Sequence, residues 1–337
     1  MKCSKAEQFG REMELSVVDT LRVSVTDRCN LRCIYCTPKE GVTSKSHEEI
    51  LRFEEMERIV RAAVRGGAHR VRLTGGEPLV RRNVARLVEL LAGIEGLSDL
   101  SMTTNGVLLA EYASILKSAG LKRITISVDS LKPERYLNIT GSSELGNVLR
   151  GIEAAHDVGL WPVKLNVVVM RGLNEDEPAD FARFAAENDI EVRFIELMPV
   201  AASEWVLRCK RAGDAMVPSA EARKRIEKEL GTLIPLENSS YRPAQIFKLP
   251  GGRGRVGFIS PVTEPFCANC TRMRLTADGK LRGCLFSAFE MDVRDALRRG
   301  AGDDELLAIF NEAVRQKPKR TAPAFSDNQR WMIEIGG

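Results

Sequence analysis

The sequence predicts an α/β fold built around a parallel sheet, because strand-like and helical patterns alternate over more than half of its 337 residues. Six short runs rich in β-branched and apolar residues lie at 21–25, 70–74, 100–104, 123–127, 163–170 and 191–197. Most of the gaps between them carry apolar residues at helical spacing. Strands joined by such helices predict a parallel sheet, either open or curled toward a barrel, with ligands at the carboxyl ends of the strands.

The helical patterns follow the strands in order. After the first strand, apolar residues recur at Met56, Ile59, Val60, Ala63 and Val64, and after the second at Val84, Leu87, Val88 and Leu91. Further helices fit 144–158 and 177–187. Each of these segments can cover one face of the sheet as a crossover helix.

The alternation stops after Met198. A helix fits 220–230, short strands fit 244–249 and 255–259, and 273–276 and 280–284 flank an Ala-Asp-Gly hairpin signal. Helices fit 293–299 and 304–315. We therefore expect a different layer here, and divide the chain into an N-terminal segment (1–20), a β/α region (21–198) and a C-terminal region (199–337).

Composition excludes several classes of protein. Hydrophobic residues make up 44% and charged residues 28%, so the chain can bury a core and is not intrinsically disordered. The net charge of +4 is too small to indicate nucleic acid binding. No apolar run suits a signal peptide or a membrane helix. We expect a cytoplasmic protein, in which clustered cysteines stay reduced and hold metal or do chemistry.

Three cysteines follow the first predicted strand as C-x3-C-x2-C: Cys29, Cys33 and Cys36. Three closely spaced thiolates suit a [4Fe–4S] cluster, and one iron would then stay open to another ligand. The alternative is a structural zinc site, but such sites close with four ligands, and His47 is the only histidine nearby.

A second triplet, Cys267, Cys270 and Cys284, has the predicted hairpin between its last two members. It is again one ligand short, which suits a second cluster with an open iron. A zinc knuckle closed by Cys209 or a carboxylate is the alternative. The remaining cysteine, Cys3, has no partner motif.

Arg272 and Arg274 stand beside the second triplet, and strand alternation places both side chains on one face. Two arginines on a strand are ordinarily a solvated face. Next to an open iron, their forked donors favour an anionic substrate, above all one with phosphate oxygens.

The first triplet, with Tyr35 between its last two cysteines, resembles the radical S-adenosylmethionine superfamily. In that superfamily the cofactor's amino and carboxylate groups chelate the open iron. The second strand ends in Gly75-Gly76-Glu77-Pro78, which resembles the superfamily's segment for the cofactor's amino group. Such a segment alone is typical of any strand-to-loop turn.

Over nearly the whole chain, from Leu21 to Gly337, the sequence resembles the GTP 3′,8-cyclase family, also called molybdenum cofactor biosynthesis protein A. The segments that carry the resemblance are VSVTDRCNLRCIYC, RLTGGEP, MTTNG, ISVDSL, KLNVVVM, RFIELMPV, VGFISP, PFCANCTRMRLTADGKLRGCLF and the final Gly-Gly. The second cysteine block discriminates best.

The resemblance implies a role for each matching residue. The two triplets would hold two [4Fe–4S] clusters. The residues at positions that contact S-adenosylmethionine are Tyr35, Gly75, Gly76, Glu77, Ser127 and Met198. The residues at positions that contact GTP are Arg22, Arg72, Thr103, Lys164, Arg272, Met273 and Arg274. Gly336 and Gly337 would reach into the active site, although two terminal glycines otherwise fray, and Arg272 or Arg274 could assist the chemistry.

The resemblance also implies a partial (incomplete) β/α barrel of about six strands, with a C-terminal α+β extension that carries the second cluster. An electron from a flavodoxin or ferredoxin type donor would cleave S-adenosylmethionine, and the resulting radical would take hydrogen from C3′ of GTP, which then closes onto C8. The product would pass to cyclic pyranopterin monophosphate synthase. A homodimer is compatible with the resemblance. Neither nucleic acid nor a membrane is an expected partner.

Two other classes of protein remain open at this point. One is a peptide-modifying radical enzyme with auxiliary clusters, although such clusters often have full cysteine ligation. The other is a zinc-bound structural or nucleic acid module, which would be colourless and contain zinc without iron.

Overall fold

The computed structural model describes residues 18–198, 200, 215–236, 243–318 and 330–336, and its strands form one twelve-stranded sheet. In chain order these are β1 (Thr20–Ser24), β2 (Arg70–Thr74), β3 (Asp99–Thr104), β4 (Arg123–Ser127), β5 (Lys164–Val169), β6 (Glu191–Glu196), β7 (Ile234–Pro235), β8 (Gln245–Lys248), β9 (Arg255–Ile259), β10 (Arg272–Leu275), β11 (Lys280–Arg282) and β12 (Met291–Asp292). All six strands expected between Leu21 and Leu197 are confirmed, with no end shifted by more than one residue.

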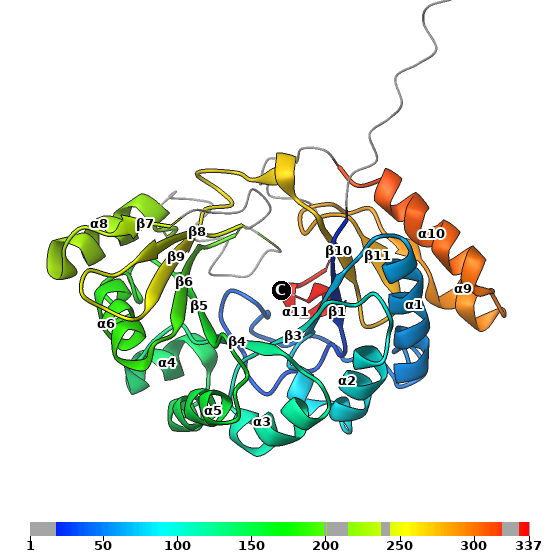
Figure 1. Cartoon of the computed structure of the whole chain (residues 1–337), viewed down its shortest axis with the longest axis horizontal. Coiled ribbons are helices and arrows are strands. Elements are labelled where there is room, and N and C mark those ends of the chain that lie inside the picture. The colour runs from blue at the N-terminus through cyan, green and yellow to red at the C-terminus, as the bar shows by residue number, and fades with distance from the viewer. Residues whose placement is uncertain (1–17, 199, 201–214, 237–242, 319–329, 337) are drawn as a thin grey trace, which may run out of the picture.

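The spatial order of the strands is β12-β11-β10-β1-β2-β3-β4-β5-β6-β9-β8-β7. Every pair from β10 to β9 is parallel, and the strands beyond them pair antiparallel. The strands follow a curved arc with helices on its outer side, while the short α11 lies on the inner side (Figure 1). The fold is therefore α/β with a sheet in which parallel pairing dominates.

Crossover helices cover the outer face. They are α1 (Phe53–Arg65), α2 (Val84–Ala92), α3 (Leu109–Ser118), α4 (Pro133–Thr140), α5 (Leu145–Asp157) and α6 (Pro178–Asn188). The other helical elements are η1 (Pro78–Val80), α8 (Ser219–Leu230), η2 (Cys267–Asn269), α9 (Arg294–Arg298), α10 (Asp303–Arg315) and α11 (Met332–Ile335). In the part of the chain that the structure describes, no helix is long and apolar enough to cross a membrane.

Strand alternation gives the sheet one apolar face and one polar face. Leu21 and Val23 on β1 are fully buried among the helices, as are Met273 and Leu275 on β10. The residues between them on each strand, such as Arg22, point to the inner side of the arc, because successive side chains of a strand alternate between faces. Aliphatic packing outside thus fixes which polar side chains face inward.

The prediction of a different layer after Met198 was wrong, because the strands there extend the same sheet. β9 pairs with β6 and β10 pairs with β1, both in parallel. Without these additions β1 and β6 would be edges with unpaired N–H and C=O groups, which favours pairing with further strands. The expected hairpin is confirmed as the antiparallel pair β10–β11.

Candidate active site

The inner side of the arc encloses a cavity of about 720 Å³. It brings together twelve of the residues singled out from the sequence: Arg22, Tyr35, Arg72, Thr103, Ser127, Lys164, Met198, Cys267, Cys270, Arg272, Arg274 and Cys284. The side chain of Met273 lies in the hydrophobic core, on the opposite face of the sheet. Gly337, Cys3 and Cys209 lie outside the described residues.

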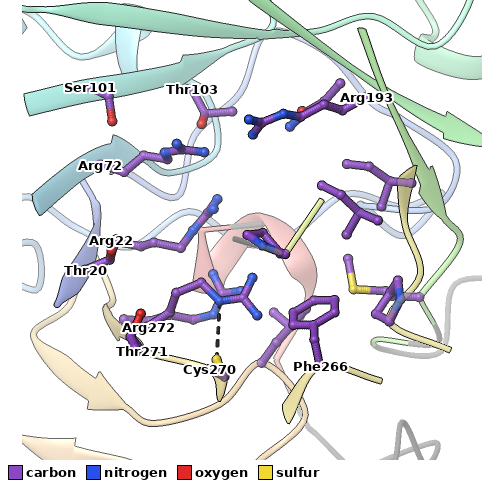
Figure 2. Close-up of a pocket in the computed structure, with 18 of the residues that line it drawn as sticks. Thr20, Arg22, Arg72, Ser101, Thr103, Arg193, Phe266, Cys270, Thr271 and Arg272 are labelled. Carbon is purple, nitrogen blue, oxygen red and sulfur yellow. Dashed lines mark hydrogen bonds between the residues drawn. The ribbon is translucent and has the colours of Figure 1, made fainter. Parts of the chain in front are cut away.

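Three arginines stand in register on adjacent strands. Arg22 on β1 lies directly opposite Arg72 on β2 and Arg274 on β10. Figure 2 shows Arg22, Arg72 and Arg272 extending into the same space, with Arg193 across from them. Parallel neighbours in register share a face, so the sheet itself concentrates positive charge here.

Burial and mutual repulsion lower the pKa values of these guanidinium groups. The pKa of Arg22 lies well below its usual range, because of burial first and then the charges of Arg274, Arg72 and Arg272. Burial, with Arg123 and Arg193, lowers the pKa of Arg72 to about 9, and burial, with Arg272, lowers that of Arg274 to about 10. Such a site gains free energy from binding an anion.

The far wall of the cavity carries cations that are paired with carboxylates. Arg123 Nε lies 2.8 Å from Asp99 Oδ1. Glu191 accepts from Arg193 Nε at 2.6 Å and pairs with Lys164 Nζ at 3.1 Å. Arg123, Arg193 and Glu191 were not predicted from the sequence as site residues, although strand alternation in EVRFIEL could have placed the last two on the inner face.

Tyr35 is held by a buried carboxylate. Its hydroxyl donates to Asp129 Oδ2 (2.7 Å), and Asp129 Oδ1 accepts from Val168 N (2.8 Å). Burial raises the pKa of Asp129 to about 6 and that of Tyr35 well above its usual range. The phenol therefore remains a neutral donor in the physiological range. Ser127 and Met198 line the same cavity.

The first cysteine triplet follows the carboxyl end of β1 and is fixed by backbone hydrogen bonds. Arg32 N donates to Thr140 O (2.9 Å) and Ile34 N to Ile139 O (3.0 Å), which ties the loop to the end of α4. Cys36 N donates to Cys33 O (2.9 Å), which makes a tight turn. The three thiols are free and partly exposed.

The Gly75-Gly76 segment packs directly against this loop. Gly76 N donates to Thr26 O (2.8 Å), and a Cβ on Gly76 would lie 2.2 Å from Arg28 O. Gly75 has φ +149°, which side chains rarely adopt. The two glycines are therefore needed to let the loops after β1 and β2 touch.

Glu77 stabilises these loops through hydrogen bonds to its carboxylate. Its carboxylate accepts from Leu79 N (3.0 Å), Thr104 Oγ1 (2.7 Å) and Asn105 N (2.6 Å), and the side chain is fully buried. Burial raises its pKa to about 7, against the effect of these donors. Sequence alone suggested a ligand contact, whereas in the structure both oxygens already accept hydrogen bonds within the protein.

The second triplet stands at the other end of the neighbouring strand. Cys267 and Cys270 precede β10, and Cys284 follows β11. Cys270 Sγ accepts from Arg272 Nε at 3.3 Å (Figure 2). The guanidinium of Arg272 also stacks on Phe266, 4.9 Å from the ring centroid. Among the described residues, no three His, Cys, Asp or Glu side chains have the arrangement of a site for a single metal ion.

The backbone of Gly336 contacts the arginine row, which is the in-register set Arg22, Arg72 and Arg274. Its carbonyl accepts from Arg274 Nη1 (2.8 Å), and its φ is +67°. A Cβ there would lie 2.8 Å from Thr74 Cγ2. Just before α11, Arg330 makes two hydrogen bonds of 3.0 Å with the carboxylate of Asp278. This ion pair anchors the segment that carries Gly336.

Comparisons with known proteins identify the fold and the family of the chain. Residues 23–185 match the family model of the Radical SAM superfamily, and 190–323 match that of Molybdenum Cofactor Synthesis C. The fold resembles two solved structures: SuiB of Streptococcus suis bound to S-adenosylmethionine (TM-score 0.58, covering 88% of this chain and 68% of that one) and native anSMEcpe with bound AdoMet (0.53, covering 88% and 83%). Both are 16% identical to this chain, which shows the fold alone. The chain has the fold and the first cysteine motif of a radical SAM protein.

The particular family follows from its sequence relatives. Proteins named GTP 3′,8-cyclase from Moorella thermoacetica and Pelotomaculum thermopropionicum are 49% and 46% identical to it, over 95% of this chain and 98% of theirs. The chain belongs to the GTP 3′,8-cyclase family.

The contact between the two loops predicts the effect of a single methyl group. In Gly76→Ala the added Cβ overlaps Arg28 O, so we expect a loss of about 2 kcal/mol or more in unfolding free energy. In the control, Gly146→Ala in α5, the methyl meets only the end of Arg150, and helix propensity predicts a gain of about 0.5 to 1 kcal/mol. Chemical unfolding of the metal-free proteins measures both. Equal stabilities would contradict the close packing.

The arginine row predicts opposite effects on stability and binding. Arg72→Met removes a partly buried cation that other cations repel, so the melting temperature of the ligand-free protein should rise. Binding of inorganic triphosphate, measured by calorimetry, should weaken at least tenfold, or about 1.4 kcal/mol. The exposed Arg86→Met on α2 is the control and should change neither quantity. A lower melting temperature for Arg72→Met would refute the repulsion.

Lys164 predicts a pH dependence. Burial, with the charge of Arg193, lowers its pKa in the folded protein to about 8 from 10.5. Between these values the unfolded chain binds more protons, so this group makes the unfolding free energy rise with pH. An anion favours the charged lysine, so triphosphate affinity should fall as pH rises above about 8. Binding isotherms of Lys164→Met should lack that fall; an identical fall would assign it to another group.

Proposed function

We propose that this protein is a GTP 3′,8-cyclase, which converts GTP to (8S)-3′,8-cyclo-7,8-dihydroguanosine 5′-triphosphate in the first step of molybdenum cofactor biosynthesis. The observation that carries the proposal is a single cavity that holds both the in-register arginines and the second cysteine triplet. The relatives named GTP 3′,8-cyclase, which match over almost their entire length, support it.

The first triplet suits a [4Fe–4S] cluster that is one protein ligand short. Cys29, Cys33 and Cys36 lie in one loop. The neighbouring loop packs against it at Gly75 and Gly76, because these two residues have no side chains. With three thiolates, one iron stays open for S-adenosylmethionine. When bound, the cluster and S-adenosylmethionine supply the radical that removes hydrogen from the ribose. Tyr35, Ser127 and Met198 are the residues that would line the cofactor's place.

The second triplet is the proposed site of a second [4Fe–4S] cluster, within a partial barrel whose sheet the C-terminal strands extend at both edges. Cys267, Cys270 and Cys284 all face the cavity, and Arg272 donates to one of their thiols. Three ligands again leave one iron for a ligand of another kind. The guanine base of the substrate would take that place.

The triphosphate would lie along Arg22, Arg72 and Arg274. Guanidinium groups bind phosphate oxygens through two parallel hydrogen bonds, and burial strengthens that attraction. Thr103 Oγ1 is buried with no hydrogen-bond partner among the described residues, and it faces the same cavity. A substrate hydroxyl or phosphate oxygen would satisfy it. Lys164 and Arg193 would complete the charge balance from the far wall.

Arg274 has a second proposed role through the end of the chain. Its guanidinium donates to Gly336 O while it lies beside Arg22. The final glycines would thereby hold this arginine toward the substrate, and Arg272 or Arg274 would also stabilise charge that develops on the base. The wall of the cavity would keep water from the radical stages.

A peptide-modifying enzyme is the alternative function within radical SAM proteins. No described feature favours it over a small polyanion. The in-register arginines favour a polyanion over a neutral peptide, because guanidinium groups bind phosphate and carboxylate oxygens through two parallel hydrogen bonds.

The test is anaerobic reconstitution followed by iron analysis and turnover with S-adenosylmethionine, a reductant and GTP. We expect about eight irons per chain, 5′-deoxyadenosine and a cyclised nucleotide. Cys267→Ser should keep the cleavage of S-adenosylmethionine and lose cyclisation, whereas Cys29→Ser should lose both. About four irons in the wild type would remove the second cluster, and cyclised product from Cys267→Ser would remove its assignment to the substrate.

A further inference from the structure

Lys317 joins the two ends of the hairpin that carries the second cysteine triplet. It follows α10, and its side chain is only 7% exposed. Its ammonium group donates to Gly283 O (2.7 Å) and Arg272 O (2.9 Å), and lies 3.7 Å from Cys270 Sγ. Arg272 opens β10 and Gly283 follows β11, so one side chain bridges both strands beside Cys270 and Cys284.

The three contacts match what a buried ammonium needs. Lysine has three N–H donors, and here each has an acceptor. Burying the charge without a counter-charge costs several kcal/mol. Among the described residues, no carboxylate forms an ion pair with Lys317, and besides the two carbonyl oxygens its ammonium group contacts the Cys270 sulfur. The charge therefore has its natural counterpart in thiolates, the form in which cysteines bind metal.

The backbone is packed to make this contact. A Cβ on Gly283 would lie 2.9 Å from the Cα of Lys317. Real Cβ atoms essentially never approach that closely. The segment after α10 therefore packs tightly against the turn before Cys284. This packing fixes the position of the Lys317 backbone.

We propose that Lys317 is a positioning residue for the second cysteine site: it fixes the spacing of Cys270 and Cys284 and places a positive charge on the Cys270 sulfur. The consequence is slower loss of the cluster and a higher reduction potential, because hydrogen bonds and charge at the sulfur ligands tune both. The inference rests on the proposed function, which supplies the second cluster.

The experiment isolates the second site in the full-length chain. Cys29, Cys33 and Cys36 are replaced by serine, so that iron analysis reports only the second triplet. In this background Lys317→Met should release iron to a chelator at least tenfold faster than the parent, and redox titration followed by electron paramagnetic resonance should give a more negative midpoint potential. Lys248→Met, an exposed lysine on β8, is the matched control and should change neither readout.

A second variant covers the case in which Lys317→Met fails to fold. Lys317→Gln keeps two donors without the charge, so it should fold, hold iron nearly as well as the parent and still show the more negative potential. If Lys317→Gln, or a folded Lys317→Met, has the parent's release rate and potential, the proposal is overturned.

Lys317 also lines the cavity, so a direct role in substrate binding is the rival explanation. In that case Lys317→Met would weaken binding of inorganic triphosphate tenfold while iron release and potential stayed unchanged, which would overturn the proposal. A parent that binds no iron at the second triplet would refute the second cluster itself and this inference with it. The two failures are thus distinguishable.

Discussion

The pairing of β1 with both β2 and β10 is the constraint on which the site depends. It sets Arg22 directly between Arg72 and Arg274 on one face of the sheet. Like charges at directly opposed positions destabilise a sheet, and burial increases their cost. The arrangement is held by the opposite face, where Leu21 and Met273 pack into the hydrophobic core. Apolar packing on one face of the sheet thus stabilises this register, although repulsion between the arginines on the other face opposes it. An anion bound in the cavity would reduce that repulsion.

The same pairing sets the separation of the two cysteine sites. β1 and β10 are parallel, the first triplet follows the carboxyl end of β1, and Cys267 and Cys270 precede the amino end of β10. The hairpin returns Cys284 to that second end. The triplets therefore stand at opposite ends of neighbouring strands, and strands of four or five residues are about 13 to 17 Å long. The arginine row lies between them, where a nucleotide could span the gap.

Features that depend on residues close together in the sequence were predicted from the sequence alone. The six strands, the hairpin at Asp278 and the two thiol loops follow from periodicity, turn chemistry and spacing. Pairing between distant segments leaves no local signal, so the addition of β9 and β10 to the sheet was missed, and with it the in-register arginines. The resemblance placed Glu77 among the residues that contact S-adenosylmethionine, and only the structure shows that Thr104 and Asn105 donate hydrogen bonds to its carboxylate oxygens. Lys317 was not singled out from the sequence, because nothing in its neighbouring residues indicates the three acceptors around its ammonium group.

The junction of β1 with β10 has a consequence for the order of folding. Asp19 and Thr271, which meet beside this junction, are 252 positions apart in the chain. Contacts between such distant segments form late, because loop closure must precede them. Until β10 and β9 dock, β1 and β6 are edges that can recruit strands of other chains. We therefore expect the nascent protein to pass through a stage in which β1 and β6 are unpaired edges beside the future active site, and in that stage it is prone to aggregate.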